Sequence, residues 1–215
     1  MSIPDRTTFP LETLTEHQRE MFRQFITHRK KDQMNIREPI WFALLLAGKR
    51  PATEITIFGP PDDPDHPITP EEIAEAFDLN YQWWADTCLD VARSSWRLDL
   101  LPSQGEVSEA YHRRLGCFYG YSEEDVEHFL TGGEQRTLPA DLVSNGVFSP
   151  DEVAYTTFVP QGHDDSIDGY NRAIEMGKTN RSTIEEYADN WGIPELAAYA
   201  TWIYHDARTD ALIHS

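Results

Sequence analysis

The chain has 215 residues, of which 40% are hydrophobic and 12% aromatic, and its 37 acidic and 18 basic side chains give a formal net charge of −19. This composition excludes a disordered chain, because it supplies enough apolar side chains for a sizeable packed core. The acidic excess argues against free nucleic acid as a main partner, since binding it requires clustered Lys and Arg side chains.

Capping signals and apolar patterns define the elements of the first half of the chain. Thr15 with Gln18 and Thr69 with Glu72 have the spacing of a capping box, which marks helix starts. The run "PIWFALLLA" is apolar on all sides, which indicates a buried helix, and it is too short to span a membrane. The expected elements are a helix from Thr15 to the basic run "THRKK", a buried helix over 39–47, a strand over 54–58, and helices over 70–77 and 80–94, with 96–101 as a strand or the tail of the last helix.

The second half of the chain shows the same kinds of signal. Ser103, Ser149 and Ser182 each precede a Glu by three residues and predict further helix starts. The β-rich run "AYTTFVP" over 154–160 predicts a strand. The expected helices are one that starts near Ser103 and ends at Gly120, one from Ser122 to Leu130, one after Ser149, and three near 165–176, 183–190 and 194–208.

These elements predict one domain over residues 1–215, of predominantly α-helical α+β class with a few short strands. Cys88 and Cys117 both fall within apolar helical patterns, so we expect free, buried thiols in a reducing, cytoplasmic compartment. Neither cysteine belongs to a CxxC motif, which excludes a thiolate-built zinc or iron–sulfur site within the chain. The N-terminus shows no signal-peptide pattern.

The dispersed acidic residues and scarce lysines are typical of salt-adapted proteins. Strong screening makes self-repulsion tolerable, because the Debye length falls to about 3 Å at 1 M salt. The charge pattern therefore indicates a halophilic source. The basic run "THRKK" is explained by its position at a helix C-terminus, where cations complement the helix dipole.

One segment concentrates candidate metal ligands between an expected strand and an expected helix. It contains His163, Asp164, Asp165 and Asp168, and such loops commonly hold ligands. His and carboxylate side chains there could bind a divalent cation such as Zn²⁺, Mn²⁺ or Mg²⁺. The structural alternative is that Asp165 caps the helix and that Asp168 complements its dipole.

Other histidines and standard catalytic motifs give weaker signals. His205 with Asp206 and His112 lie beside the apolar stripes of their helices, and we expect them to be solvated. His66 lies in a proline-rich loop and is expected at the surface. The chain has no GxSxG, GxGxxG, GxxxxGK[ST] or HExxH motif, so no familiar catalytic or phosphate-binding signature is present.

Three segments resemble an uncharacterised archaeal family, DUF483. "LGCFYGYSEEDVEHFL" over 115–130 resembles the family signature "LGxxxGYPxCCVxxF". "FVPQGHDDSIDGYNRAIEMG" over 158–177 resembles its later "PCxxxCxxS" element, and "REPIWFALLLAGKRPATEI" over 37–55 resembles its N-terminal segment. The resemblance implies an archaeal origin and spans about residues 37–177.

The chain departs from that family pattern at the cysteines. Glu124 and Asp125 stand where the signature has its paired cysteines, and Gln161 and Asp165 stand where the later element has its own. If the family cysteines form a metal or iron–sulfur site, this chain cannot reproduce it. Either the site is lost, or carboxylates and His163 have replaced the thiolates for a harder metal.

The leading functional hypothesis is therefore a non-catalytic or degenerate scaffold or binding protein, without a cofactor, which contacts a protein or a small ligand. The alternative is a metal-dependent, hydrolase-like enzyme. Its candidate metal ligands are Glu124, Asp125, His163, Asp164 and Asp165. The two hypotheses differ in whether these side chains converge on one point in the fold.

Overall fold

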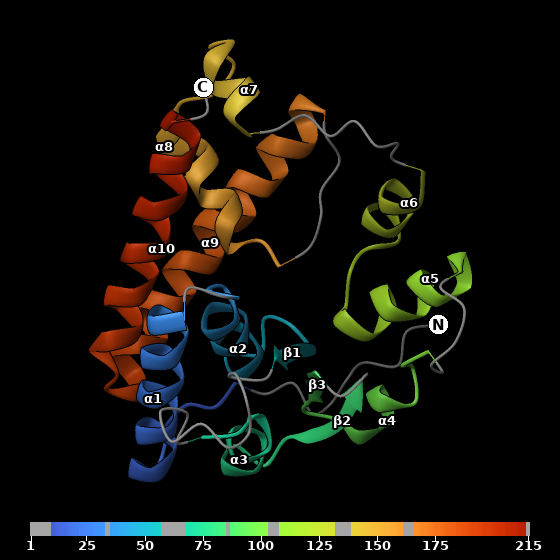
Figure 1. Cartoon of the computed structure of the whole chain (residues 1–215), viewed down its shortest axis with the longest axis vertical. Coiled ribbons are helices and arrows are strands. Elements are labelled where there is room, and N and C mark those ends of the chain that lie inside the picture. The colour runs from blue at the N-terminus through green and yellow to red at the C-terminus, as the bar shows by residue number, and fades with distance from the viewer. Residues whose placement is uncertain are drawn as a thin grey trace.

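The structure of the chain is a computed structural model that describes residues 10–32, 35–56, 68–84, 87–102, 108–131, 139–160 and 166–213. Helices dominate these residues and one small antiparallel sheet accompanies them, which confirms the expected α-rich α+β class (Figure 1). The elements are α1 Glu16–Asp32, α2 Glu38–Leu46, β1 Ala52–Thr56, α3 Pro70–Ala76, β2 Asn80–Trp84, β3 Cys88–Ala92, α4 Ser95–Leu98, α5 Glu109–Tyr119, α6 Glu123–Thr131, α7 Pro139–Ser144, α8 Pro150–Val153, the 3₁₀ helix η1 Ala154–Phe158, α9 Ile167–Trp191 and α10 Pro194–Ile213.

Three of the expected capping boxes are present. Thr69 and Ser149 each accept a hydrogen bond from the third helical residue, whose glutamate side chain bonds back to the cap, and Thr15 exchanges the same bonds with Gln18. Ser103 lies outside the described residues, and α5 begins instead after Ser108, whose side chain accepts from the Tyr111 N–H. Local capping chemistry thus fixes where most helices begin.

The main core lies between α1, α2, α9 and α10 on one side of the molecule (Figure 1). Phe42 of α2 packs edge to face on Phe22 and on Phe77, with ring centroids 5.5 and 5.1 Å apart. Leu44 and Leu45 are no more than 1% exposed, which confirms α2 as a buried helix. Trp41 was expected to be buried with them, but it is only half-buried.

A three-stranded sheet with the order β1-β3-β2 occupies part of the region predicted to be a helix over 80–94. That prediction is wrong: β2 and β3 both pair antiparallel through this segment. Its sequences, "NYQWW" and "CLDVA", are rich in residues that fit a pleated surface, and each is too short for a stable helix. The segment over 96–101, expected as a strand or a helix tail, starts with the separate short helix α4.

Two further predictions are wrong in the second half. Residues 154–158 form a 3₁₀ helix rather than a strand, because they continue the capped helix α8 without a break. The helices expected over 165–176 and 183–190 are one helix, α9, so Ser182 is not a cap. Gly177 allows this long helix to pass η1 closely, since a Cβ there would lie 2.0 Å from the Tyr155 carbonyl oxygen.

A buried ion pair joins α1, α2 and β1. Arg29 Nη2 lies 2.5 Å from Glu38 Oε2, and both side chains are 1% exposed. Thr56 of β1 donates its N–H and its hydroxyl to Glu38 Oε1, while its own carbonyl accepts from Arg29. Arg29 belongs to the run "THRKK", so the helix dipole alone does not explain that run. Of the helices in the described residues, none has the length and apolar character needed to cross a membrane.

Candidate functional site

A polar cluster lies on the face of the sheet that α5 covers. Glu54 of β1 pairs directly with Asp90 of β3, and Cys88 follows on the same face two residues away. Asp90 is 2% exposed and Cys88 is 6% exposed, whereas Glu54 is half-buried. The opposite face carries Ile55, Leu89 and Val91, which join the main core. Strand alternation therefore separates an apolar face from a face with three potential metal ligands.

These three side chains converge, and Tyr119 of α5 closes the group. Their ligand atoms all lie within 4.8 Å of one another, and within the described residues no other set of three His, Cys, Asp or Glu does so. The Cys88 thiol donates to Glu54 Oε2 across 3.4 Å. The Tyr119 hydroxyl lies 2.7 Å from Asp90 Oδ1 and 3.2 Å from Glu54 Oε2, and its one proton is shared between these two acceptors. We call Glu54, Cys88 and Asp90 the sheet cluster.

The interior shifts the titration of the sheet cluster towards its protonated forms. Burial raises the pKa of Asp90 to about 7, a rise that Glu54 adds to and the Tyr119 hydroxyl opposes. Burial, Glu54 and Asp90 also raise the pKa of the Cys88 thiol. Two like-charged carboxylates opposite each other in a strand pair repel. The cluster therefore requires either protons or a bound cation to be stable.

A buried arginine adjoins the cluster. Arg50 is 6% exposed, and its guanidinium carbon lies 5.7 Å from the Trp41 ring centroid and 5.8 Å from that of Tyr119. Burial lowers its pKa, while Tyr121, Tyr119 and Glu54 oppose that change. Its Nε and Nη1 atoms have no hydrogen-bond partner among the described residues. Arg50 thus supplies one positive charge beside two carboxylates, which leaves the cluster short of positive charge when both are ionised.

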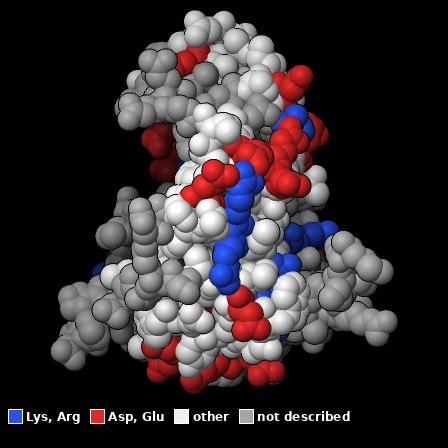
Figure 2. Space-filling view, turned by 90° about the vertical axis from the view of Figure 1, so that its right-hand side faces the viewer, with Lys and Arg blue, Asp and Glu red and all other residues white. Residues whose placement is uncertain are grey.

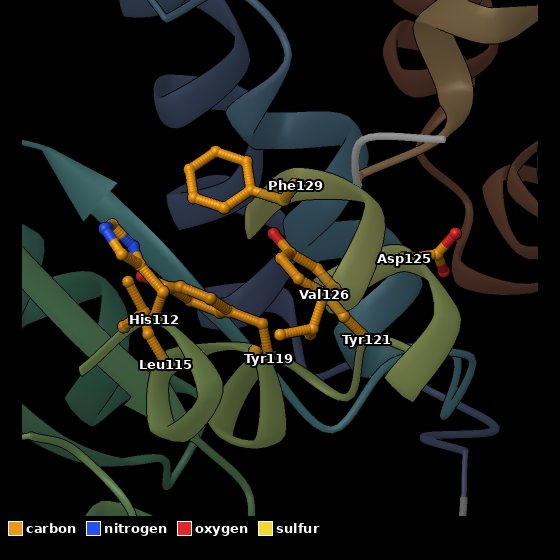
Figure 3. Close-up of a pocket in the computed structure, with 8 residues that line it drawn as sticks. His112, Leu115, Tyr119, Tyr121, Asp125, Val126 and Phe129 are labelled. Atoms are coloured by element: carbon orange, nitrogen blue, oxygen red, sulfur yellow. The ribbon is translucent and has the colours of Figure 1, made fainter. Parts of the chain in front are cut away.

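A separate pocket of about 180 Å³ lies between α5 and α6, and Tyr119 forms part of its wall (Figure 3). Gly116 lets the two helices approach, because a Cβ there would lie 2.4 Å from Val126 Cγ2. The pocket is lined by His112, Leu115, Gly116, Tyr119, Tyr121, Asp125, Val126 and Phe129. The polar sheet cluster and this mostly aromatic pocket therefore lie on two sides of the same tyrosine.

The predicted metal ligands of the second half do not form a cluster in the described residues. His163, Asp164 and Asp165 lie outside those residues, so their part in a metal site remains a prediction. Glu124 is exposed and pairs with Arg172, and Asp125 accepts a hydrogen bond of 2.6 Å from the Ser122 hydroxyl. Ser122 in turn accepts from the Asp125 N–H, as expected of the cap of α6.

Described residues on either side of positions 161–165 do approach the start of α6. Pro160 accepts a hydrogen bond from the Tyr121 hydroxyl at 3.1 Å, and Arg172 of α9 lies 3.4 Å from Glu124. The N-cap of α9 is Ser166, whose side chain accepts from Gly169, so the expectation that Asp165 caps this helix is wrong. Asp168 still lies in the first turn, where its charge complements the dipole.

Other residues singled out from the sequence have ordinary positions, with two exceptions. His205 and Asp206 are exposed on α10, as expected, and His66 lies outside the described residues. His112 is half-buried rather than solvated, and its ring packs on Phe129 at 5.0 Å. Cys117 is exposed rather than buried. Cys88 is buried as expected, but on a strand.

Basic side chains on this side of the molecule lie beside acidic ones. Figure 2, which faces the side that carries α5 and α6, shows Lys and Arg side chains bordered by Asp and Glu. Arg113 of α5 pairs with Glu109 and with Glu127 of α6. The pair with Glu127 joins α5 to α6, and the pair with Glu109 lies within α5.

Comparisons with protein-family models, curated proteins and solved structures return no match. The resemblance to DUF483 therefore stays a prediction. The sheet cluster was missed because residues 80–94 were interpreted as a helix. Side chains two residues apart, such as Cys88 and Asp90, point to the same face of a strand but not of a helix, so they were not expected to meet Glu54. The available signal was alternation, since Cys88 and Asp90 are separated by one apolar residue in a β-rich run.

Proposed function

We propose that the protein is a binding protein for one divalent transition-metal ion, held by the sheet cluster, with Zn²⁺ the best match. The observation that carries the proposal is the convergence of Glu54, Cys88 and Asp90 within 4.8 Å. Thiolate and carboxylate ligands together suit a borderline cation better than Mg²⁺, which prefers oxygen ligands alone.

The distances within the cluster fit such an ion. Zn–S bonds of about 2.3 Å and Zn–O bonds of about 2.0 Å in a tetrahedral site place the sulfur and oxygen about 3.5 Å apart. The Cys88 sulfur and Glu54 Oε2 lie 3.4 Å apart. The Tyr119 hydroxyl supports Asp90 from outside, as partners of metal-bound carboxylates do. Three protein ligands leave a fourth position for water or for a ligand atom.

Charge balance also supports the proposal. Three carboxylates lie close enough to shift the pKa values of one another or of Cys88, namely those of Glu38, Glu54 and Asp90. The nearby cations are Arg29 and Arg50. With a proton on Asp90 and on Cys88, the charges cancel without metal. A divalent ion that displaces both protons restores the same balance. The cluster can therefore exchange two protons for one metal ion without a net charge in the interior.

Calorimetric titration of EDTA-treated, dialysed protein with Zn²⁺ tests the proposal. We expect one-to-one binding with a Kd below about 1 μM, and Co²⁺ should give the thiolate-to-metal charge-transfer band. Cys88→Ser and Asp90→Asn should each weaken Zn²⁺ binding at least tenfold. Cys117→Ser is the matched control, since it removes the only other, exposed thiol and should bind normally.

The same titration separates this site from the one expected in the second half. If His163→Ala or Asp125→Asn abolishes binding while Cys88→Ser does not, the metal lies in the 122–165 region and the proposal is wrong. If the wild-type protein shows no stoichiometric Zn²⁺ binding, the proposal is also wrong, and the sheet cluster is a protonated, hydrogen-bonded group without a metal. We also propose that the protein is salt-adapted, cytoplasmic and archaeal; these three properties do not depend on the metal site and need separate tests.

A further inference from the structure

The pocket between α5 and α6 has aromatic walls and does not belong to the sheet cluster. Tyr119 and Tyr121 stack with ring centroids 5.6 Å apart, and His112 packs on Phe129 at 5.0 Å. Figure 3 shows these four rings around the pocket, whereas the Asp125 carboxylate points away from them. Leu115 and Val126 complete the lining with apolar atoms. The surface that a ligand would meet is therefore mostly carbon.

The volume of the pocket limits the size of its occupant. An apolar cavity of about 150 Å³ is known to accommodate benzene. The pocket here measures about 180 Å³, which suits one aromatic ring or two fused rings. Aromatic rings also gain beyond the area they bury when they stack offset or edge to face on other rings. Size and lining both favour a small, flat, aromatic occupant over a peptide or a lipid chain.

The polar groups of the wall are directed to other partners. The Tyr119 hydroxyl donates to Asp90 and Glu54, and the Tyr121 hydroxyl donates to the Pro160 carbonyl. The two tyrosines therefore present ring carbons, rather than hydroxyl groups, to the pocket. A charged ligand would lose its hydration there without a compensating hydrogen bond from either tyrosine.

The surrounding charges disfavour a cation and an anion alike. Arg50 already lies over the Tyr119 ring at 5.8 Å, so a ligand cation near that ring would face a buried positive charge. An anion would lose its hydration there, because the described lining residues include no Lys or Arg to replace it, and the Asp125 carboxylate, although it points away from the rings, adds negative charge nearby. An uncharged ligand avoids both penalties.

We propose that this pocket is a binding site for an uncharged aromatic small molecule of one or two fused rings. The site depends on the rings of α5 and α6 and not on a metal ion in the sheet cluster. Leu115 and Phe129 are the residues whose replacement should affect it most directly. The first lies in the floor of the pocket on α5, and the second is 48% exposed on α6, so that changing it has little influence on the core.

Ligand-observed NMR and thermal-shift titration of metal-free full-length protein provide the test, with indole, phenol, benzoate and benzylamine as probes. We expect saturable one-to-one binding of indole or phenol, at least tenfold tighter than that of benzoate or benzylamine. Leu115→Phe, which fills the pocket, should weaken this binding at least tenfold. Leu212→Phe introduces the same change at an exposed position of α10 and should have no effect.

Phe129→Ala provides a second variant in case Leu115→Phe does not fold, and it should weaken binding at least fivefold while the protein stays folded. Equal binding of all four probes, or binding that neither pocket variant weakens, would overturn the proposal. Neither result bears on the metal proposal, because that proposal is tested by the Zn²⁺ affinity of the Cys88 and Asp90 variants.

Discussion

Glu54 and Asp90 lie directly opposite each other on β1 and β3, and the single hydroxyl of Tyr119 is within 3.2 Å of one carboxylate and 2.7 Å of the other. Two carboxylates in that position repel unless a proton or a cation lies between them. Arg50 supplies only part of the compensation, because its guanidinium carries one positive charge beside two carboxylates. The stability of this part of the core should therefore depend on pH and on metal.

The first prediction concerns the pH dependence of the metal-free protein. Burial raises the pKa of Asp90 to about 7, whereas an unfolded aspartate titrates near pH 4. Between these values the folded state holds a proton that the unfolded state has lost, so the free energy of unfolding should fall as pH rises from about 4 to about 7. At about 1.4 kcal/mol per pKa unit, the effect amounts to a few kcal/mol. Urea denaturation across this range measures it.

Asp90→Asn is the variant that isolates this contribution, since it keeps the acceptor for Tyr119 but cannot ionise. It should flatten the decline and make the metal-free protein more stable than wild type at pH 8. Asp189→Asn, an exposed change on α9, is the control. An unchanged slope in Asp90→Asn would show that Asp90 stays ionised in the fold.

The second prediction concerns Tyr119. Its hydroxyl lowers the pKa of Asp90 by donating a hydrogen bond to the carboxylate. Tyr119→Phe should therefore raise that pKa further, increase proton competition and weaken Zn²⁺ binding at pH 6.5 more than at pH 8, with a loss of about 1–2 kcal/mol in folding stability. Calorimetry at the two pH values measures the first effect and urea denaturation the second.

Tyr121→Phe is the matched control for that experiment. It removes the hydroxyl of the stacked neighbour, which donates to Pro160 rather than to a carboxylate. Its Zn²⁺ affinity should have the same pH dependence as the wild type. Equal effects of the two variants would mean that the hydrogen bond between Tyr119 and Asp90 does not set the pH dependence of Zn²⁺ binding.

The helical part of the fold could be predicted because its signals are local. Thr69 and Ser149 cap their helices through hydrogen bonds with residues three positions later. The run of α2 is apolar on all sides, which by itself predicts that the helix is buried. The errors arise where long-range packing decides. The run at 80–84 becomes a strand because it pairs with 88–92, which also pairs with β1, and α9 continues past residue 182 because it packs against η1, α10 and α2.

The sheet cluster depends on that long-range pairing, so the alternation of Cys88 and Asp90 could indicate a strand but not its partner strand. Glu54 and Asp90 are 36 residues apart in the chain and meet only through the register of β1 with β3. Arg50 and Glu38 likewise look like surface residues in the sequence, yet both are buried. The segment over 115–130, which resembles the family signature, contributes residues to the aromatic pocket, and the acids within it form a helix cap and an exposed ion pair.

The third prediction concerns the buried pair of Arg29 and Glu38. Glu38→Gln leaves the Arg29 guanidinium buried without its counter-charge, so we expect a loss of about 3–5 kcal/mol in the free energy of unfolding. Glu185→Gln removes the partner of Arg181 in an exposed pair on α9 and should cost less than about 1 kcal/mol. Equal losses in urea denaturation would contradict the structural role of the buried pair.

The fourth prediction concerns salt. With a net charge of −19, repulsion between acidic side chains should destabilise the fold at low ionic strength, and added salt should screen it, since the Debye length falls from about 10 Å at 0.1 M to about 3 Å at 1 M. We expect the Tm to rise by more than about 10 °C between 0.1 and 2 M KCl. Neutralising the exposed Glu12, Glu186 and Asp189 should raise the Tm at low salt and reduce that response. Glu12 and Glu186 both lie near Tyr187, whose pKa is raised by burial and by these two charges, so the two acids place negative charge in one region. A Tm that stays flat in KCl for wild type and variant alike would rule out salt adaptation and leave the acidic surface without a role in folding stability.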